Sequence, residues 1–197
     1  MIDDVLRLLR DQLYTALHDA AGTASGGAED LVVLPDGEKL GDAVSFRLGA
    51  VSLLLLNLQE EHVLRAADPF VQRAPDGTHL RVPPEIRLNL FVLCVAHFSA
   101  YTDSWKQLAQ IVTFFQRHRV LNPANTPNLN LAIDQLVVEL VTLSFAEQNE
   151  IWGSLRTVAR PSLLYRIRLL IFRPDGGTAL PGVKSTAVTA RPTPARA

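Results

Sequence analysis

The sequence predicts an α/β (α+β) protein with a single mixed, largely antiparallel sheet covered by helices. Two apolar runs, 51–58 and 86–97, have the length of strands, and in 163–172 one alternating side is apolar while the other places two arginines among apolar residues. Stretches with helical spacing of apolar residues lie before and between these runs. The resulting order is helix, strand, hairpin, strand, helix, strand, short helix, strand. This order indicates one sheet covered by helices, with antiparallel pairing expected.

The run 86–97 is the strand around which we expect the sheet to form. Both alternating sets of its residues are mostly apolar. A half-solvated strand would alternate with polar residues, so this pattern predicts burial on both faces near the middle of the sheet. Pro83 and Pro84 precede the run and cannot donate to a ladder, so pairing should begin after them.

The first half of the chain divides into a helix, a connection, a strand and a hairpin. Residues 2–20 carry one apolar stripe at helical spacing, which predicts an amphipathic helix. The segment 22–42 is rich in Gly, Ala, Ser and Asp and predicts an exposed connection with a short strand at 31–34. The run 51–58 predicts a second buried strand. Residues 62–82 predict a protruding hairpin around an Asp-Gly turn.

The second half predicts two helices and two strands. Thr102, Asp103 or Ser104 can cap a helix whose apolar stripe begins at Trp105, which we expect in the core together with Trp152. The range 135–143 alternates as a strand with one wetter face. Ser144-Phe145-Ala146-Glu147 is a capping-box sequence and predicts a short helix that stops near residue 153. The range 163–172 predicts a strand with one dry face.

Composition separates a folded domain, residues 1–172, from a flexible basic C-terminal extension, residues 173–197. Pro, Gly, Thr, Ala and Ser dominate the extension, which cannot pack a core alone. Its Val183–Ala190 stretch has enough β-branched residues to add as a strand to the sheet edge of another chain. A permanently disordered extension is the alternative that the sequence leaves open.

The net charge, the cysteine count and the lengths of the apolar runs exclude several classes of partner and site. The net charge is −1, so no bulk field attracts nucleic acid or an anionic membrane. The single cysteine, Cys94, excludes an intramolecular disulfide and a cysteine-based metal cluster within one chain. The N-terminus lacks an apolar signal core, and no apolar run approaches the ~20 residues of a membrane helix. Synthesis in the cytoplasm is therefore expected.

The sequence contains no convincing catalytic, cofactor-binding or metal-binding set. Cys94 and His97 lie three residues apart on a strand and so should face opposite sides. A small hydrolase or ligand-binding enzyme would have to use His97, Asp103 or His118. The better candidates bind a protein partner and are basic or β-branched: Arg65, Arg73, Arg81, Arg173, Val183, Lys184, Val188 and Arg191.

Three blocks of sequence resemble a known family. They are the Pro83-Pro84 pair with the strand 87–90, the segment 143–152, and the strand segment 160–167. Together with the N-terminal helix, they make residues 1–172 similar to the tail-terminator (cap) proteins of extracellular contractile injection systems, which are phage-tail-like particles.

The resemblance implies a structural protein with no catalysis and no cofactor. Such caps form a six-membered ring on the distal end of the inner tube and meet the last sheath ring, which ends elongation. The implied partners are further copies of the chain, the inner tube protein and the sheath protein, first in the cytoplasm and then in a released particle. A baseplate or adaptor ring component on a similar fold remains the main alternative.

Overall fold

The computed structural model describes residues 1–21, 31–35, 44–61, 71–73, 79–81, 86–130, 132–172 and 178–179. The chain divides into two compact units. The first consists of Met1–Glu61 and Arg87–Ile171, and the second of His62–Ile86 and Phe172–Ala197.

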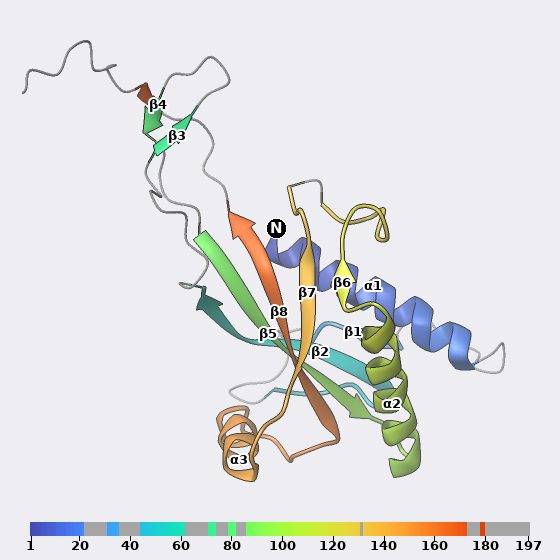
Figure 1. Ribbon diagram of the computed structural model, residues 1–197. Helices are drawn as coiled ribbons and strands as arrows, with labels where there is room; N and C mark the ends of the chain where they lie inside the picture. The colour runs from blue at the N-terminus through green and yellow to red at the C-terminus, as the bar shows by residue number, and fades with distance from the viewer. Residues whose placement is uncertain are drawn as a thin grey trace, which may run out of the picture. The chain divides into compact units, whose positions relative to one another are not determined.

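The first unit is built on a six-stranded sheet with the order β1-β2-β5-β8-β7-β6 (Figure 1). Its strands are β1 Val32–Val33, β2 Ala50–Glu60, β5 Ile86–His97, β6 Val120–Leu121, β7 Leu136–Val141 and β8 Ser162–Phe172. β1 pairs with β2 in parallel, whereas β2–β5, β6–β7 and β7–β8 are antiparallel. The predicted fold class, a mixed and largely antiparallel sheet with helices, is therefore confirmed.

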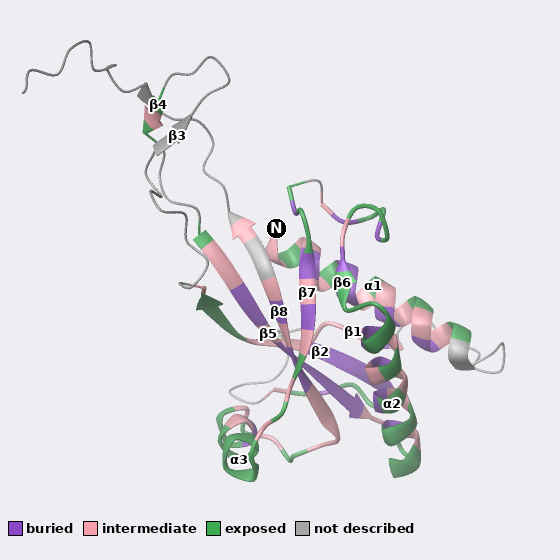
Figure 2. Cartoon of the chain, in the orientation of Figure 1, coloured by how far each residue is buried: buried purple, intermediate pink, exposed green. Residues whose placement is uncertain are grey.

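β5 lies inside the sheet between β2 and β8. Its residues Val92 to Ala96 are all buried, so both faces of the strand are covered (Figure 2). This confirms the prediction drawn from its two apolar sides, because consecutive residues of a strand point to opposite faces. β2 pairs with β5 along most of its length, with a register irregularity between Leu55 and Asn57.

Helices cover both faces of the sheet. α1 Ile2–Ala21 and α2 Tyr101–Arg117 contact each other, and the ring of Phe115 in α2 packs on Tyr165 of β8. α3 Phe145–Ser154 instead buries Trp152 in a cluster that includes Leu164 of β8. Because Leu164 and Tyr165 are consecutive strand residues, α2 and α3 lie on opposite faces (Figure 1).

Two expectations for α2 are wrong. The helix begins at Tyr101 with Ala100 as its N-cap, which has no side-chain hydrogen bond, so none of the expected caps acts. Ser104 is buried instead. Trp105 is 51% exposed rather than in the core, because the buried side of α2 is formed by Ser104, Leu108, Ile111 and Phe115. Its ring packs edge-on against that of Tyr101, 5.6 Å between ring centroids.

The capping box that opens α3 is confirmed. The Ser144 Oγ accepts a hydrogen bond from the Glu147 backbone N–H at 3.3 Å, and the Glu147 carboxylate accepts one from the Ser144 N–H at 2.8 Å. These bonds hold the carboxylate in its charged form and lower the pKa of Glu147. The first turn of α3 is therefore satisfied locally, independently of the sheet.

The second unit contains a three-stranded sheet with the order β3-β4-β9. β3 Val71–Arg73 and β4 His79–Arg81 pair antiparallel, which confirms the predicted hairpin. β9 Thr178–Ala179 pairs antiparallel with β4, so the C-terminal segment contributes a strand to this sheet.

Candidate functional site

The residues considered for an enzyme each have a local structural partner. The Nδ1 atom of His97 lies 2.9 Å from the Phe46 carbonyl oxygen, and Nδ1 of His118 lies 3.0 Å from the Phe114 carbonyl oxygen. Asp103 accepts a hydrogen bond from Lys106 at 3.0 Å. Cys94 is buried, and burial raises the pKa of its thiol to about 12. At neutral pH this cysteine is therefore a neutral thiol and not the thiolate that acts as a nucleophile.

The described ranges contain neither a candidate metal cluster nor a candidate membrane-spanning helix. Across those residues, no three His, Cys, Asp or Glu side chains gather in a way that could hold a metal ion. No helix within them combines the length and the apolar character needed to cross a bilayer.

Of the predicted partner-binding residues, two lie in the described part of the chain. Arg81 is exposed on β4, opposite Val71 and Thr178 in the sheet register. Arg73 lies on β3, opposite His79. The other candidates lie outside the described residues: Arg65, Arg173, Val183, Lys184, Val188 and Arg191.

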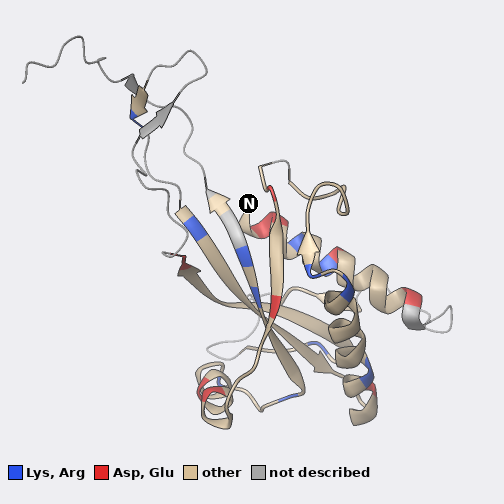
Figure 3. Ribbon diagram, viewed as in Figure 1, with Lys and Arg blue, Asp and Glu red and all other residues tan. Residues whose placement is uncertain are grey.

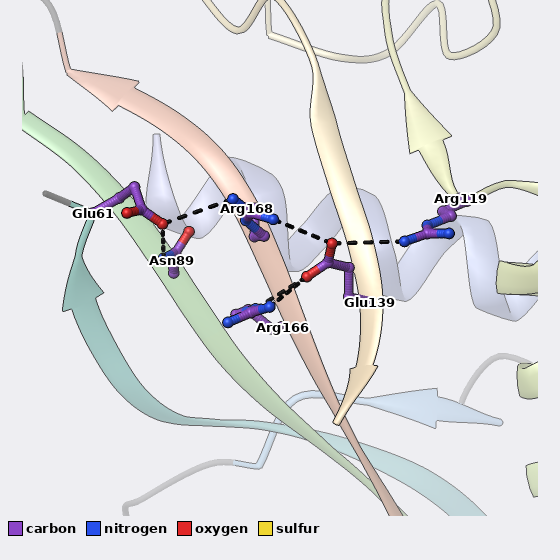
Figure 4. A network of polar contacts seen from close by, with 6 residues as sticks. All are labelled: Glu61, Asn89, Arg119, Glu139, Arg166 and Arg168. Carbon is purple, nitrogen blue, oxygen red and sulfur yellow. Dashed lines mark hydrogen bonds and ion pairs between the residues drawn. The ribbon is translucent and has the colours of Figure 1, made fainter. Parts of the chain in front are cut away.

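A network of charged side chains crosses the sheet of the first unit (Figure 4). At its centre, Glu139 of β7 contacts Arg166 of β8 at 2.6 Å, Arg168 at 3.3 Å and Arg119 at 3.7 Å. Arg168 also lies 3.8 Å from Glu61, which accepts a hydrogen bond from Asn89 at 3.1 Å. The network thus links β5, β7 and β8 and the residues beside β2 and β6.

The register of the strands explains this network. Glu139 and Arg166 are directly opposite in the β7–β8 pair, where side chains of opposite charge stabilise pairing. Hydrogen bonds from Arg166, followed by those from Arg168, hold the pKa of Glu139 below its ordinary value, although burial opposes that shift. Glu139 and Glu61 are both largely shielded from solvent, so their charges depend on these arginines.

Apolar side chains on the surface form a second kind of feature. Phe145 at the start of α3 is 92% exposed, the largest exposure of any large apolar residue in the described part. A cavity of about 610 Å³ lies between α2 and the strands β7 and β8. It is lined by Val112, Phe115, Gln116, Arg119, Val138, Glu139, Leu140, Tyr165 and Arg166. Sequence reasoning missed both features, since each depends on which apolar residues the sheet leaves uncovered.

The fold is similar to that of solved terminator proteins of contractile injection systems. The cryo-EM structure of an extracellular contractile injection system, the PVC sheath/tube terminator in its extended state, matches with a TM-score of 0.59 and 19% identity. The match covers 97% of this chain and 64% of that one, so the chain spans slightly less than two thirds of the terminator. The cap of the anti-feeding prophage gives a TM-score of 0.49 at 18% identity, over 77% of this chain and 56% of that one.

The chain belongs to the Pvc16 N-terminal domain family, whose model matches residues 4–185. The resemblance found in the sequence is thereby confirmed for family and fold. A comparison with curated proteins gives no significant match.

Proposed function

We propose that this chain is a structural cap of a contractile, phage-tail-like injection particle. It forms a ring on the distal end of the inner tube and contacts the last sheath ring, so that elongation stops. The observation that supports this most strongly is membership of the Pvc16 N-terminal domain family over residues 4–185. The matching terminator is a component of tube and sheath ends, and the same role is proposed here.

The proposed cap works by shape and contact, without catalysis or a cofactor. A terminator must hold its surfaces rigid, and the buried β5 strand and the network around Glu139 supply that rigidity in the first unit. Its partners are other copies of the chain in a six-membered ring, the inner tube protein and the sheath protein. Assembly takes place in the cytoplasm, and the finished particle is released.

Contact with tube and sheath is assigned to the basic and β-branched candidates. In this proposal residues 1–172 form the ring body and residues 173–197 form an extension that reaches the sheath. Arg81 is exposed on β4, where a long basic side chain can meet a carboxylate on a neighbouring protein. The arginines at 65, 73 and 173 extend the same basic character along the chain.

Deleting the gene from cells that produce the particle tests the role. Loss of a cap is expected to give tubes and sheaths of uncontrolled length, measured by negative-stain electron microscopy, and the full chain supplied in trans should restore a single length. Absence of any assembled tube would instead assign the chain to the baseplate or to an adaptor ring. Particles of unchanged length distribution would refute the proposal.

Two variants test the contact residues. Arg81→Glu reverses a charge at an exposed site and is expected to reduce retention of the cap on purified particles. Arg7→Glu makes the same change of charge on the exposed side of α1 and serves as the control. Truncation before Arg173 should leave a folded body that binds the sheath poorly. Equal retention of all variants on particles would show that these residues make no such contact.

A further inference from the structure

The sheet of the first unit has two edges that differ in how they are protected against pairing with another chain. A strand edge presents backbone N–H and C=O groups that accept a further strand, and natural edges are blunted by charges, prolines or bulges. β2 is protected beyond its short pairing with β1, because its register is irregular between Leu55 and Asn57. The Asn57 side chain also accepts a hydrogen bond from the Leu58 N–H at 2.8 Å.

The backbone of β7 is open on its outer side from Leu140 onward. β6 pairs with β7 only at its first two residues, and the Val138 N–H donates to the Arg119 carbonyl oxygen at 2.8 Å. Backbone groups of alternate residues point to the same side of an antiparallel strand, so those of Leu140 and Thr142 also point away from β8. Within the described ranges, no residue pairs with them there.

Residues 140–143, here called the open edge of β7, carry none of the usual protection. Their sequence is Leu140-Val141-Thr142-Leu143, without a charge, a proline or a glycine. The charge of β7 is confined to Glu139 (Figure 3). Leu140 is 51% exposed, although β7 is buried where it begins at Leu136 (Figure 2). An uncharged, apolar edge of this kind favours pairing with a further strand.

A pocket lies beside the open edge on each face of the sheet. Leu140 is opposite Tyr165 on the face of α2, where it lines the cavity of about 610 Å³. A smaller pocket of about 200 Å³ lies beside α3, and all four residues of the open edge line it together with Ile151 and Trp152. Side chains of an added strand alternate between the two faces, so they would enter both pockets. Pockets for alternate side chains are what give strand addition its specificity.

The C-terminal extension supplies a segment suited to this edge. Among the ranges outside the described residues, 183–191 is the longest run without Pro or Gly, and it is rich in β-branched residues. Pro181 and Pro192 lie on either side of it and limit a strand, since proline has no N–H to donate. The preceding strand β9 pairs with β4, so strand addition already occurs in this part of the chain.

We propose that Val183–Ala190 of one copy adds as a strand to the open edge of β7 in the next copy of the ring, with Val188 in the pocket beside α3. The inference rests on the proposed function, since it assumes a ring. It assigns the middle of the extension to the neighbouring cap and leaves the residues on either side of it for the sheath. From Ala179 to Val188 an extended chain spans about 30 Å, the diameter of a small domain, which is enough to reach a neighbour. Each copy donates one strand and accepts another, so the contacts run head to tail and close a ring.

Mass photometry of the full chain over a concentration series tests the donated strand. Consecutive N–H groups of a strand point to opposite sides, so Ala187→Pro together with Val188→Pro removes a ladder donor in either register. Ring formation by this variant should need at least about tenfold more protein. The control carries Thr193→Pro and Ala195→Pro, two prolines in the same extension outside the proposed strand. Ring formation by both variants at the unaltered concentration overturns the inference.

Amide hydrogen exchange tests the accepting edge residue by residue. The amides of Leu140 and Thr142 should exchange fast in the dilute monomer and become protected in the ring. The Val138 amide is the internal reference, since its bond to Arg119 protects it in the single chain. Fast exchange of Leu140 in assembled rings would show that the edge stays open, and this result refutes the proposal.

Disulfide cross-linking tests which two segments meet. Chains carrying Val188→Cys are mixed with chains carrying Leu143→Cys, and the buried Cys94 does not compete. Mixed dimers should form faster than with Leu48→Cys, although Leu48 is 58% exposed and so is easier to reach. Equal rates at positions 143 and 48 overturn the inference. A single chain carrying both Val188→Cys and Leu143→Cys that closes its own disulfide as a monomer also overturns it.

Failure of the inference and failure of the proposed function give different results. If rings form and tubes end normally while the paired prolines and the cross-links show no effect, another contact makes the ring and the cap role stands. A chain that stays monomeric at every concentration overturns the inference. If deletion of the gene leaves tube length unchanged, the cap role itself is wrong.

Discussion

Trp152 is the side chain that attaches α3 to the body of the protein. It is 7% exposed, and its ring meets that of Phe46 edge-on at 5.8 Å between centroids. Leu93, Val95 and Leu164 complete the cluster. Replacing a buried Phe or Trp by Ala costs ~3–5 kcal/mol, through lost burial and the cavity left behind. Because domains of this kind are stable by only ~5–15 kcal/mol, Trp152→Ala should remove a large part of the free energy of unfolding.

Urea unfolding followed by far-ultraviolet circular dichroism measures this loss. Phe145→Ala removes an aromatic ring from the same helix where it is exposed, so its effect should stay within about 0.5 kcal/mol. A difference of less than about 1 kcal/mol between the two variants would refute the reasoning, since cavity formation is what separates them.

Three further predictions concern charge, reactivity and local order. The pKa of Glu139 is lowered, so its ion pairs stabilise the folded state at pH values above the ordinary carboxyl pKa near 4.5, and this stabilisation is lost as the pH falls through the folded pKa. The difference in urea midpoint between the unaltered chain and Glu139→Gln should therefore shrink as the pH is lowered from 6. A difference that stays constant with pH would contradict this. Cys94 should react with a thiol reagent at pH 8 only after denaturation, and rapid labelling of the native protein would show that it is accessible. Ser144→Ala removes the side-chain cap of α3 and should cost about 1 kcal/mol. The amides of α3 should then exchange faster in the variant than in the unaltered chain, while those of α2 stay the same. Equal exchange rates of α3 in the two proteins would contradict this prediction.

Local patterns were enough to predict much of the fold. β5 was predicted correctly because apolar residues on both alternating sides of a strand indicate that both of its faces are covered. The capping box of α3 depends on residues three positions apart. The pairing of β3 with β4 was predicted from the strand-forming residues on either side of an Asp-Gly sequence. The family resemblance followed from the same strand and helix blocks and is confirmed over residues 4–185. The basic candidates for partner binding remain predictions.

Exposure of aromatic residues and the long-range charge network could be read only from the folded chain. Phe145 and Trp152 are seven residues apart, so helix periodicity places them on one face, yet Phe145 is exposed and Trp152 buried. The sheet covers one end of α3 and not the other, and no local pattern encodes that extent. Glu139 and Arg168 likewise meet because β7 and β8 pair in one particular register. Periodicity specifies which side of an element is apolar, whereas packing of distant segments determines how much of that side is covered.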